Sequence, residues 1–414
     1  MSKAPSCCDD FDPQAQTVDS ALARILEALT PVAGREQVPL LGAYDRVLAA
    51  DLLSPVDVPA WANSAMDGYA LRAVDGDAPR RVVGTSLAGH PFAGMVDAGE
   101  CVRIMTGAPM PAGADTVVMQ EHVTRDGDQV RLSGAPKAGD NVRHAGEDLR
   151  HGSLAVPAGT LLRPATVGVL ASLGIGEISV YRRLRVAFFS TGDELQPVGA
   201  PLAPGQIYDS NRYTLHGMLR RLGAQPLDLG RVPDDPAALE QALREASSMA
   251  DVVITSGGVS VGEADFVKDL LERLGRVNFW KINMKPGRPL AFGEINGATF
   301  FGLPGNPVSV MATFYQFVRP ALLKRMGMAQ VEPLPLLRVR CLDTLKKRPG
   351  RVEFQRGRLQ RDANGEWVVR STGSQGSHVL SSMSSANCFI VLPQESPGVE
   401  AGGVVEVQLW EGLV

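Results

Sequence analysis

Residues 251–275, DVVITSGGVSVGEADFVKDLLERLG, place a short apolar run, a glycine-rich loop and an amphipathic pattern in direct succession. The apolar run predicts a buried strand, and the spacing of the leucines after it predicts a helix. The same order occurs twice earlier, in LRVAFFST (184–191) with NRYTLHGMLRRLG (211–223) and in PLDLGRV (226–232) with PAALEQALREASS (236–248). Strands that alternate with helices in this way predict a mostly parallel sheet with helices on both faces.

Three further apolar segments and a long helical pattern complete this region. RVNFWKIN (276–283), LAFGEI (290–295) and ATFFGL (298–303) predict strands, and residues 307–327 predict one helix. We therefore assign residues 184–332 to a three-layer α/β domain.

The segments before and after this region have a different pattern. Residues 53–151 consist of short apolar runs between glycine and proline clusters, which predicts a β-rich domain. Residues 333–414 carry only strand patterns, such as LLRVRCL and VVEVQLW, and predict a C-terminal β-barrel or a sandwich. Of these two, we adopt the barrel.

The N-terminal part of the chain predicts a small domain interrupted by the β-rich one. A helix is expected in TVDSALARILEALT (17–30), where Thr17 can cap it, and a buried helix in TVGVLASLGI (166–175). Residues 17–52 and 152–183 together form this discontinuous domain. Residues 1–16 are polar, contain Cys7 and Cys8, and are expected to be a flexible tail.

Composition narrows the functional classes. The chain has 414 residues, 44% of them hydrophobic and 21% charged, and a net charge of −4. Such a charge argues against a nucleic-acid surface, which needs a basic field. No apolar run approaches the ~20 residues of a membrane span. The five cysteines show no CxxC spacing and no disulfide framework, so we expect a cytoplasmic protein that binds neither nucleic acid nor membrane.

The residues that follow the strands of the α/β domain are candidates for a binding site. In an open parallel sheet, ligands bind beyond the carboxyl ends of the strands. In chain order, the residues expected at this edge are Ser190, Thr191, Gly192, Asp193 and Glu194; Asp234 and Asp235; Gly257, Gly258, Ser260 and Asp265; Lys281 and Lys285; and Pro304, Gly305, Asn306 and Pro307.

The stretch LPGNPVS (303–309) forms a stiff corner between a strand and a helix. A helix that starts near Pro307 presents free N–H groups and the positive end of its dipole to this edge. Pro304 and Pro307 fix the corner, and Gly305 lets the backbone approach a ligand closely. This loop and the glycine loop at 256–262 therefore suit a phosphate or another oxyanion.

Charged side chains extend this interpretation. Lys281, Lys285 and Arg288 add positive charge. Glu194 and Asp265, together with Asp234, suit a hard cation such as Mg²⁺, which commonly bridges a carboxylate and a phosphate. The combination predicts a phosphorylated ligand held with a metal ion.

Simpler readings exist for each feature. PGNP is also a turn, SGGVSVG is not a GxGxxG motif, and Asp234 with Asp235 can cap a helix. The lysines can be solvated surface charges, and the six histidines show no ligand spacing. Asp67 and Gly68 can form a hairpin turn. In the C-terminal domain, basic and serine-rich stretches at 346–359 and 372–382 can be solvated strands or donors for a tetrahedral oxyanion.

Eight long motifs, in this order, resemble those of the MoeA family of molybdopterin molybdenumtransferases, which is similar to the E domain of gephyrin. They are SAMDGYA (64–70), TGAPMPAGADTVV (106–118), RHAGED (143–148), STGDEL (190–195), TSGGVSVGEADF (255–266), KPGRP (285–289), LPGNPVS (303–309) and GSQGSHVLSSMSSANCFI (373–390). The resemblance covers about residues 17–414 and makes 184–332 a molybdopterin-binding domain.

The resemblance implies an activity and a set of site residues. Such proteins insert molybdenum from molybdate into adenylylated molybdopterin and release AMP. Catalytic roles carry over to Asp67, Thr106, Glu194, Asp265, Lys281 and Lys285, with Mg²⁺ on Glu194 and Asp265. Cofactor binding is implied for Arg143 of the RHAGED stretch and for Arg356 and Ser377 as the oxyanion positions of the C-terminal domain. At the sheet edge it is assigned to Ser190, Thr191, Gly192, Asp234, Gly257, Gly258, Ser260, Pro304, Gly305, Asn306 and Pro307.

The resemblance also implies partners. Members of the family are homodimers whose site lies between the α/β domain of one subunit and the β-rich domain of the other. The sequence contains no counterpart of the adenylylating domain fused in gephyrin, so we expect a separate molybdopterin adenylyltransferase. Maturation proteins of molybdoenzymes are expected downstream. A non-catalytic scaffold or carrier for the cofactor and a tungstate-inserting enzyme remain alternatives.

Overall fold

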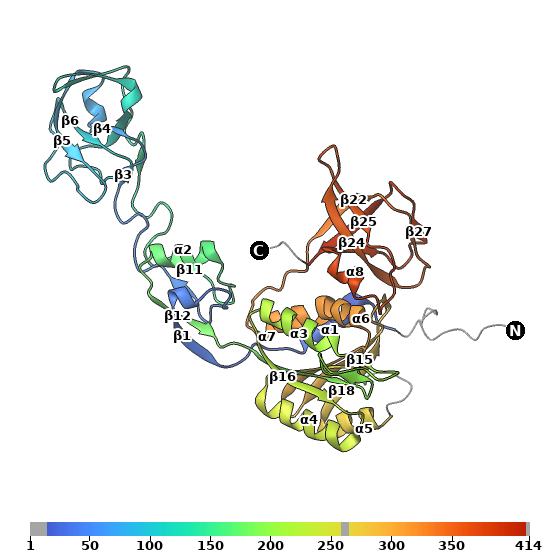
Figure 1. The fold of residues 1–414 in the computed structure, drawn as a ribbon. Coiled ribbons are helices and arrows are strands. Elements are labelled where there is room, and N and C mark those ends of the chain that lie inside the picture. The colour runs from blue at the N-terminus through green and yellow to red at the C-terminus, as the bar shows by residue number, and fades with distance from the viewer. Residues whose placement is uncertain (1–14, 258–264, 411–414) are drawn as a thin grey trace. The chain divides into compact units, whose positions relative to one another are not determined.

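The computed structural model describes residues 15–257 and 265–410 (Figure 1). For Asp265 and Phe266 it describes the backbone only. The Cys7–Cys8 tail lies outside the described residues. The chain divides into two compact units. Unit 1 consists of Met1–Glu36, Asp45–Ala49 and Val180–Val414, and unit 2 consists of Gln37–Tyr44 and Ala50–Ser179. The finer division expected from the sequence stays a prediction.

The α/β part of unit 1 is built on a six-stranded sheet with the order β16-β13-β17-β21-β20-β18. The strands from β16 to β21 are parallel, as the sequence predicts, whereas β20 and β18 are each antiparallel to the preceding neighbour. The sheet is therefore mixed. Its strands are β13 (Arg185–Thr191), β16 (Gln225–Val232), β17 (Val252–Ser256), β18 (Gly275–Lys281), β20 (Pro289–Ile295) and β21 (Ala298–Leu303).

The reversal at β20 has a local cause. β20 and β21 are joined by Asn296 and Gly297, whose φ angles are 46° and 85°. Two residues with positive φ make the tight turn of a hairpin, whereas a parallel connection needs about a dozen residues or more. Because β18 reverses once more, its carboxyl end at Lys281 lies on the same edge as the carboxyl ends of the parallel strands.

Helices cover both faces of this sheet, as predicted (Figure 1). On one face, α4 (Pro236–Met249) and α5 (Asp265–Leu274) share a buried apolar cluster with Phe189 of β13. On the other face, Phe188 of β13 contacts His216 of α3 (Ser210–Arg221) edge to face. Alternate residues of one strand thus serve opposite layers, which explains why the strand sequences are apolar throughout.

Two predicted helices of unit 1 have different outcomes. α1 (Val18–Glu27) starts as expected, because the Thr17 hydroxyl accepts a hydrogen bond from the Ser20 N–H at 3.1 Å. The helix expected over 307–327 is present, since helical turns run without a break from Pro307 to Arg325, but it is not one regular α-helix. It is divided into α6 (Pro307–Thr313), a π-helical turn η4 (Phe314–Val318) and α7 (Arg319–Arg325). Pro320 has no N–H to offer the preceding turn, which accounts for the widened segment before it.

The C-terminal part of unit 1 is a closed five-stranded barrel, which confirms the predicted barrel. Its order is β24-β25-β22-β28-β26, and β26 pairs again with β24. The five strands are β22 (Leu336–Cys341), β24 (Val352–Arg361), β25 (Trp367–Ser371), β26 (Cys388–Leu392) and β28 (Val404–Leu409). Apolar side chains from all of them, including Val339, Leu359 and Ile390, fill its interior.

The barrel is joined to the α/β part by backbone and side-chain contacts. β19 (Met284–Lys285) pairs with β24 in parallel. Tyr315 of the π-helical turn stacks on Trp410 with ring centroids 5.7 Å apart. The Val308 N–H, in the first turn of α6, donates to the Ser377 carbonyl at 3.1 Å. α6 and the π-helical turn, which follow the carboxyl end of β21, therefore also contact the barrel.

Unit 2 contains the predicted β-rich region. Its six-stranded sheet has the order β7-β4-β6-β5-β9-β8. The strands are β4 (Gly68–Leu71), β5 (Arg80–Ser86), β6 (Glu100–Ile104), β7 (Thr116–Met119), β8 (Val123–Asp126) and β9 (Gln129–Leu132). The helix expected at 166–175 is α2 (Pro164–Ser172), which buries Val167 and Leu170.

The hairpin reading of Asp67 and Gly68 is wrong. The strand before them, β3 (Asn63–Ser64), pairs with β10 (Val142–Arg143) and not with β4. β4 itself lies between β6 and β7. Asp67 therefore stands at the entrance of a central strand, where its carboxylate reaches a loop distant in sequence.

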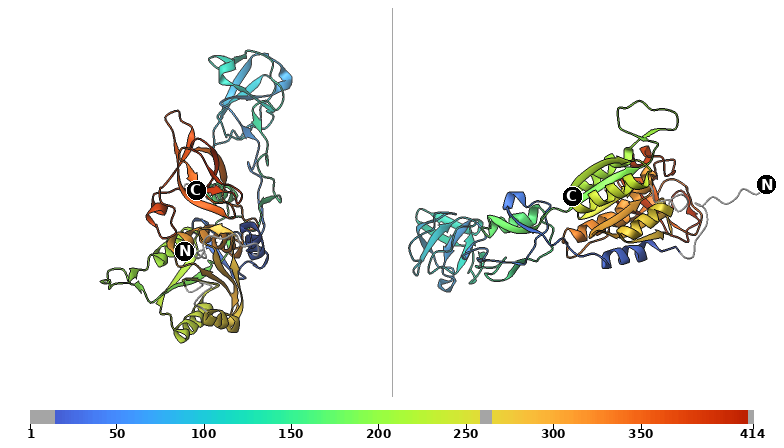
Figure 2. Two further views of the ribbon diagram at one scale, coloured as in Figure 1. Left: turned by 90° about the vertical axis from the view of Figure 1, so that its right-hand side faces the viewer. Right: turned by 90° about the horizontal axis from the view of Figure 1, so that it is seen from below.

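Short elements complete the fold. Figure 2 shows the segment between β14 (Leu195–Gln196) and β15 (Ile207–Tyr208) extending away from the α/β part. Among the described helices, no stretch is long and apolar enough to cross a membrane. The short elements are β1 (Arg35–Pro39), η1 (Leu40–Gly42), β2 (Leu52–Leu53), η2 (Ala73–Asp75), η3 (Gln120–His122), β11 (Leu154–Val156), β12 (Glu177–Tyr181), β14 (Leu195–Gln196), β15 (Ile207–Tyr208), β23 (Leu345–Lys346), α8 (Ser381–Ser384) and β27 (Gly398–Val399).

A charged contact anchors the amino end of the central strand β17. The Asp251 carboxylate accepts hydrogen bonds from both terminal nitrogens of Arg182, at 2.6 and 2.7 Å, and from the Arg185 N–H at 2.9 Å. Burial by itself would raise the pKa of Asp251, but these hydrogen bonds outweigh it and hold the pKa below its ordinary value.

We expect Asp251→Asn to lower the free energy of unfolding by roughly 1–3 kcal/mol at neutral pH, because hydrogen bonds to a charged group contribute about that much. The folded-state pKa lies below the unfolded value, so this contribution is complete above the ordinary pKa of 3.8 and disappears as the pH falls through the folded value. The difference in melting temperature between wild type and variant should narrow in acid.

Thermal unfolding at neutral and acidic pH measures this difference. Glu240→Gln, which breaks the surface pairs of Glu240 with Arg244 and Arg273, serves as the control and should have a small effect. A difference between wild type and Asp251→Asn that stays constant with pH would contradict the role of the charge.

Candidate active site

Three strand ends lie level at the carboxyl edge of the sheet. Ser190 of β13 pairs with Ser256 of β17, and Ser256 pairs with Leu303 of β21. The loops that follow these three positions therefore begin side by side. This register brings together the predicted residues Ser190, Thr191, Gly192, Gly257, Pro304 and Gly305. Gly258 and Ser260 lie outside the described residues.

Glycine is required where these loops approach one another. Gly257 has φ +93°, and a Cβ there would lie 2.6 Å from the Thr191 carbonyl oxygen. Gly305 stands beside it, because a Cβ on Gly305 would lie 3.9 Å from the Gly257 Cα. Backbone groups of three loops thus form a continuous surface, which is how glycine-rich loops present N–H groups to phosphates.

Acidic side chains collect at one side of this surface. A Cβ on Gly192 would lie 2.5 Å from the Glu194 carboxylate, so the Glu194 side chain folds back over the strand end. The Asp234 N–H donates to Asp193 at 3.3 Å. Burial raises the pKa of Asp234, and the charges of Asp193 and Glu194 raise it further. A cation would relieve this repulsion, so the carboxylates fit the chemistry of Mg²⁺.

The fit to a metal ion rests on these carboxylates only. Among the side chains that the structure describes, no group of three or more His, Cys, Asp and Glu residues is close enough together to hold a metal ion. The Asp265 side chain, a predicted ligand, is not described. Asp235 is the helix cap that the simpler reading proposed, since its carboxylate accepts from the Ala238 N–H at 2.8 Å. Asp234 does not share that bond.

The start of α3 contacts the same strand ends, a feature that the sequence reasoning missed. Asp209 caps α3, and its Oδ1 accepts from the Ser190 hydroxyl at 3.0 Å. The Ser190 and Ser256 hydroxyl oxygens are 3.0 Å apart. Asn211 donates to the Gly305 carbonyl at 2.6 Å. The signal was the triplet Asp-Ser-Asn before a helical pattern, a typical start of a helix.

The start of α6 differs from the expectation. The sequence predicted free N–H groups at this helix end, but Pro307 has none and the Val308 N–H donates to Ser377 of the barrel. The Asn306 side chain makes no capping bond and is exposed. The stiff corner thus directs the helix toward the barrel, and Gly305 and Asn306 are the groups that face outward.

The predicted lysines lie where the α/β part meets the barrel. Lys281 is exposed at the end of β18. The half-exposed Lys285 side chain pairs with the buried Glu353 of β24, with Nζ 3.2 Å from Oε1. Gln355 holds the other Glu353 oxygen at 2.9 Å. The ammonium group of Lys285 is therefore oriented by the barrel.

Arg356 has an environment that the sequence did not indicate. Its side chain is 1% exposed, and it donates to the Ser382 hydroxyl at 2.9 Å and to the carbonyls of Ser374 and Gly376 at 3.3 and 3.0 Å. Burial lowers its pKa to about 10. Arg356 thus braces the loop that carries the partly exposed Ser377 and does not extend a free guanidinium fork to the surface.

The predicted residues of unit 2 form one close pair. The Asp67 carboxylate accepts from both the backbone N–H and the hydroxyl of Thr106, each at 2.7 Å. These two bonds, the backbone bond first, lower the pKa of Asp67. The pair holds an exposed carboxylate in one orientation. Arg143 is exposed at the end of β10.

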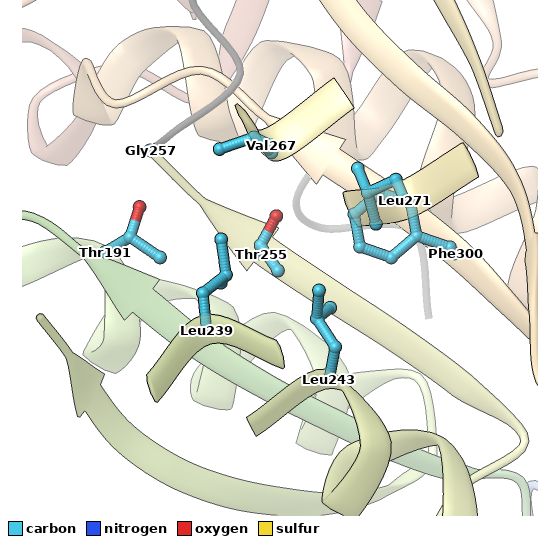
Figure 3. Close-up of a pocket in the computed structure, with 8 residues that line it drawn as sticks. All are labelled: Thr191, Leu239, Leu243, Thr255, Gly257, Val267, Leu271 and Phe300. Atoms are coloured by element: carbon cyan, nitrogen blue, oxygen red, sulfur yellow. The ribbon is translucent and has the colours of Figure 1, made fainter. Parts of the chain in front are cut away.

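A cavity beneath the binding edge is too small for a substrate. Figure 3 shows the Thr191 and Thr255 hydroxyls directed toward this space, under Gly257. It measures about 10 Å³, which is room for about one water molecule. It is lined by Thr191, Leu239, Leu243, Thr255, Gly257, Val267, Leu271 and Phe300. This cavity therefore holds no substrate, and the open edge of the sheet above it is the candidate binding surface.

Comparisons with known proteins cover nearly the whole chain. Family models match it at residues 16–174, described as MoeA N-terminal region (domain I and II), at 187–324, described as probable molybdopterin binding domain, and at 338–410, described as MoeA C-terminal region (domain IV). The binding edge lies within the second match.

Individual relatives agree with these models. A molybdopterin molybdenumtransferase of Haemophilus influenzae is 47% identical over 401 residues, 96% of this chain and 99% of that protein. Gephyrin of Dictyostelium discoideum is 35% identical over 444 residues, 95% of this chain and 62% of that protein. The crystal structure of a molybdopterin biosynthesis moeA protein from Pyrococcus horikoshii OT3 matches with a TM-score of 0.82 at 30% identity, over 96% of this chain and 100% of that one.

Proposed function

Because the chain belongs to the MoeA family and is a molybdopterin molybdenumtransferase of molybdenum cofactor biosynthesis, we propose that it transfers molybdenum from molybdate to adenylylated molybdopterin and releases AMP. The observation that supports this most is the carboxyl edge of the sheet. There, three glycine-containing loops lie beside a group of carboxylates, a combination suited to a diphosphate-linked nucleotide.

Different residues of this chain bind the phosphates and the metal ion. The backbone from Ser190 to Gly192 and at Gly305 binds the phosphates. Gly257 allows the close approach but supplies no donor, because its N–H donates to the Leu303 carbonyl at 3.1 Å. Glu194 and Asp265 would hold Mg²⁺, which would neutralise charge on the diphosphate. Support for this role comes from the position of Glu194 over Gly192 and from the raised pKa of Asp234 beside it.

Molybdate binds near the junction of the α/β part with the barrel. A dianion with four acceptor oxygens needs several donors. Lys285 supplies a charge oriented by Glu353, and Ser377 supplies a hydroxyl on the loop braced by Arg356. Lys281, at the end of β18, adds positive charge. In the homodimer that we propose, Asp67 and Thr106 would come from the other subunit and supply a carboxylate of fixed orientation to the pterin end of the substrate.

The direct test is incubation of the protein with adenylylated molybdopterin, molybdate and Mg²⁺. We expect AMP and metal-loaded pterin in equal amounts. Omitting Mg²⁺ or introducing Glu194→Gln should slow AMP formation about ten- to a hundredfold, since a lost interaction of a charged group is worth about 1.5–3 kcal/mol. Glu240→Gln, which removes a partly exposed carboxylate of α4, is the control.

The outcomes separate the proposed activity from its alternatives. Tight binding of the pterin without AMP release would overturn the enzyme and favour a scaffold or carrier. Equal turnover with tungstate would show that the enzyme does not select molybdate over tungstate. AMP formation that is unaffected by Mg²⁺ would exclude the metal role of Glu194 and Asp265.

The molybdate site predicts different effects for two neighbouring residues. Ser377→Ala should leave the melting temperature unchanged and raise the molybdate concentration for half-maximal turnover about three- to tenfold, since a neutral hydrogen bond contributes about 0.5–1.5 kcal/mol. Arg356→Ala should raise that concentration and also lower the melting temperature, because it leaves two loop carbonyls without their donor.

The exposed Ser384 of α8 gives the matched serine control, and Ser384→Ala should change neither quantity. Product formation against molybdate concentration and a melting curve for each variant provide the measurements. An unchanged molybdate dependence in folded Ser377→Ala removes this residue from the site.

The proposal extends to a cytoplasmic homodimer supplied by a separate molybdopterin adenylyltransferase. Unit 2 exposes large apolar side chains, with Leu41 at 84% and Trp61 at 61%, which a second subunit would cover. The described cysteines Cys101, Cys341 and Cys388 are free and buried, which suits a reducing compartment. Sedimentation should give twice the chain mass of 44.0 kDa, and a species of the single chain mass only would argue against the dimer.

A further inference from the structure

We propose that Asp209 and Asn211, at the start of α3, are positioning residues that hold the three substrate-binding loops level. The loops in question follow β13, β17 and β21. This inference rests on the proposed function, because it assigns these loops to binding of the adenylylated pterin. Neither side chain needs to touch the substrate for this role.

Asp209 connects α3 to two of the strands. Its side chain is only 3% exposed. Oδ1 accepts from the Ser190 hydroxyl at 3.0 Å and from the Arg212 N–H at 3.2 Å. The Ser190 hydroxyl is in turn 3.0 Å from that of Ser256. One carboxylate oxygen therefore fixes both the start of the helix and the ends of β13 and β17.

Asn211 connects the same helix to the third loop. Its Nδ2 donates to the Gly305 carbonyl at 2.6 Å, within the stiff corner between β21 and α6. Gly305 lies beside Gly257, which follows β17. The first residues of α3 thus reach every loop of the binding surface that the structure describes at these three strand ends.

The local cost of this arrangement indicates a role beyond helix capping. Among the described residues, nothing donates to the buried Asp209 Oδ2 or pairs with the buried Asn211 Oδ1. A buried carboxylate with one oxygen unsatisfied is unfavourable, and a cap needs no such burial. Asp235 caps α4 at 2.8 Å although it is exposed to solvent. The buried position is explained if Asp209 must reach Ser190.

The experiment compares four variants with wild type. Asp209→Ala removes the cap and the bond to Ser190, whereas Asp209→Asn keeps an acceptor oxygen in the same place. Asn211→Leu keeps the size of the side chain, removes its N–H donor and introduces no charge. Asp235→Ala removes an equivalent cap that has no contact with the strand ends. Calorimetry with adenylylated molybdopterin gives Kd, and thermal unfolding gives Tm.

We expect Asp209→Ala and Asn211→Leu to weaken binding about tenfold or more, which corresponds to about 1.4 kcal/mol. Asp209→Asn should stay within about threefold of wild type. Asp235→Ala should lower Tm by a few degrees, as a lost cap does, with Kd unchanged. The sign is informative, because removing the negative charge of Asp209 near an anionic ligand would by itself tighten binding.

Other results decide against the inference. If Asp209→Ala and Asn211→Leu lower Tm but bind like wild type, the two residues serve stability alone and the inference is overturned. If Asp209→Asn loses as much affinity as Asp209→Ala, the charge and not the position matters, which also overturns it. If wild type itself fails to bind the adenylylated pterin, the proposed function fails and the inference with it.

Discussion

The level ends of three parallel strands are the constraint on which the site depends. β13, β17 and β21 are buried on both faces, so a slip of one residue would turn every side chain to the wrong layer. Ser190, Ser256 and Leu303 are therefore fixed in one row. The loops after them start so close together that only glycine fits at position 257. Binding surface is created from backbone, while the space below it is filled by packed side chains.

The strand order separates the charges along this edge. Asp234 follows the outer strand β16 and Glu194 follows its neighbour β13, whereas Lys281 ends β18 at the opposite side of the sheet. Side chains of opposite charge would pair and neutralise each other if these strands were adjacent. The separation leaves an acidic region suited to a cation and a basic region suited to an oxyanion, with the glycine loops between them. A substrate with a diphosphate and a separate reacting group fits such a division.

Sequence patterns predicted the alternation of strands and helices, the barrel and the meeting of the strand ends, because burial on both faces leaves a strong apolar signal. The reversed strand β20 was missed although Asn296–Gly297 is a strong hairpin signal. Pro320 was a similar sequence signal for the π-helical turn η4 that precedes it. In contrast, the contact of Asp67 with Thr106 and the burial of Arg356 depend on loops far apart in the chain. No local pattern indicates them, and only the family resemblance singled out these residues.

The barrel shows why a charged residue type does not by itself define a site. The family resemblance assigned Arg356 to an oxyanion, a role that suits the planar fork of a guanidinium group. In the structure its donors bind Ser382 and the carbonyls of Ser374 and Gly376. An anion that took these donors would leave the loop carbonyls unsatisfied, at a cost similar to what it gains. An anion that binds the exposed ammonium group of Lys285 leaves no loop carbonyl without its donor. The Glu353 carboxylate, which pairs with Lys285, keeps the hydrogen bond from Gln355. In the molybdate site that we propose, recognition of the oxyanion is therefore assigned to Lys285 and Ser377, and the role of Arg356 is to keep Ser377 in place.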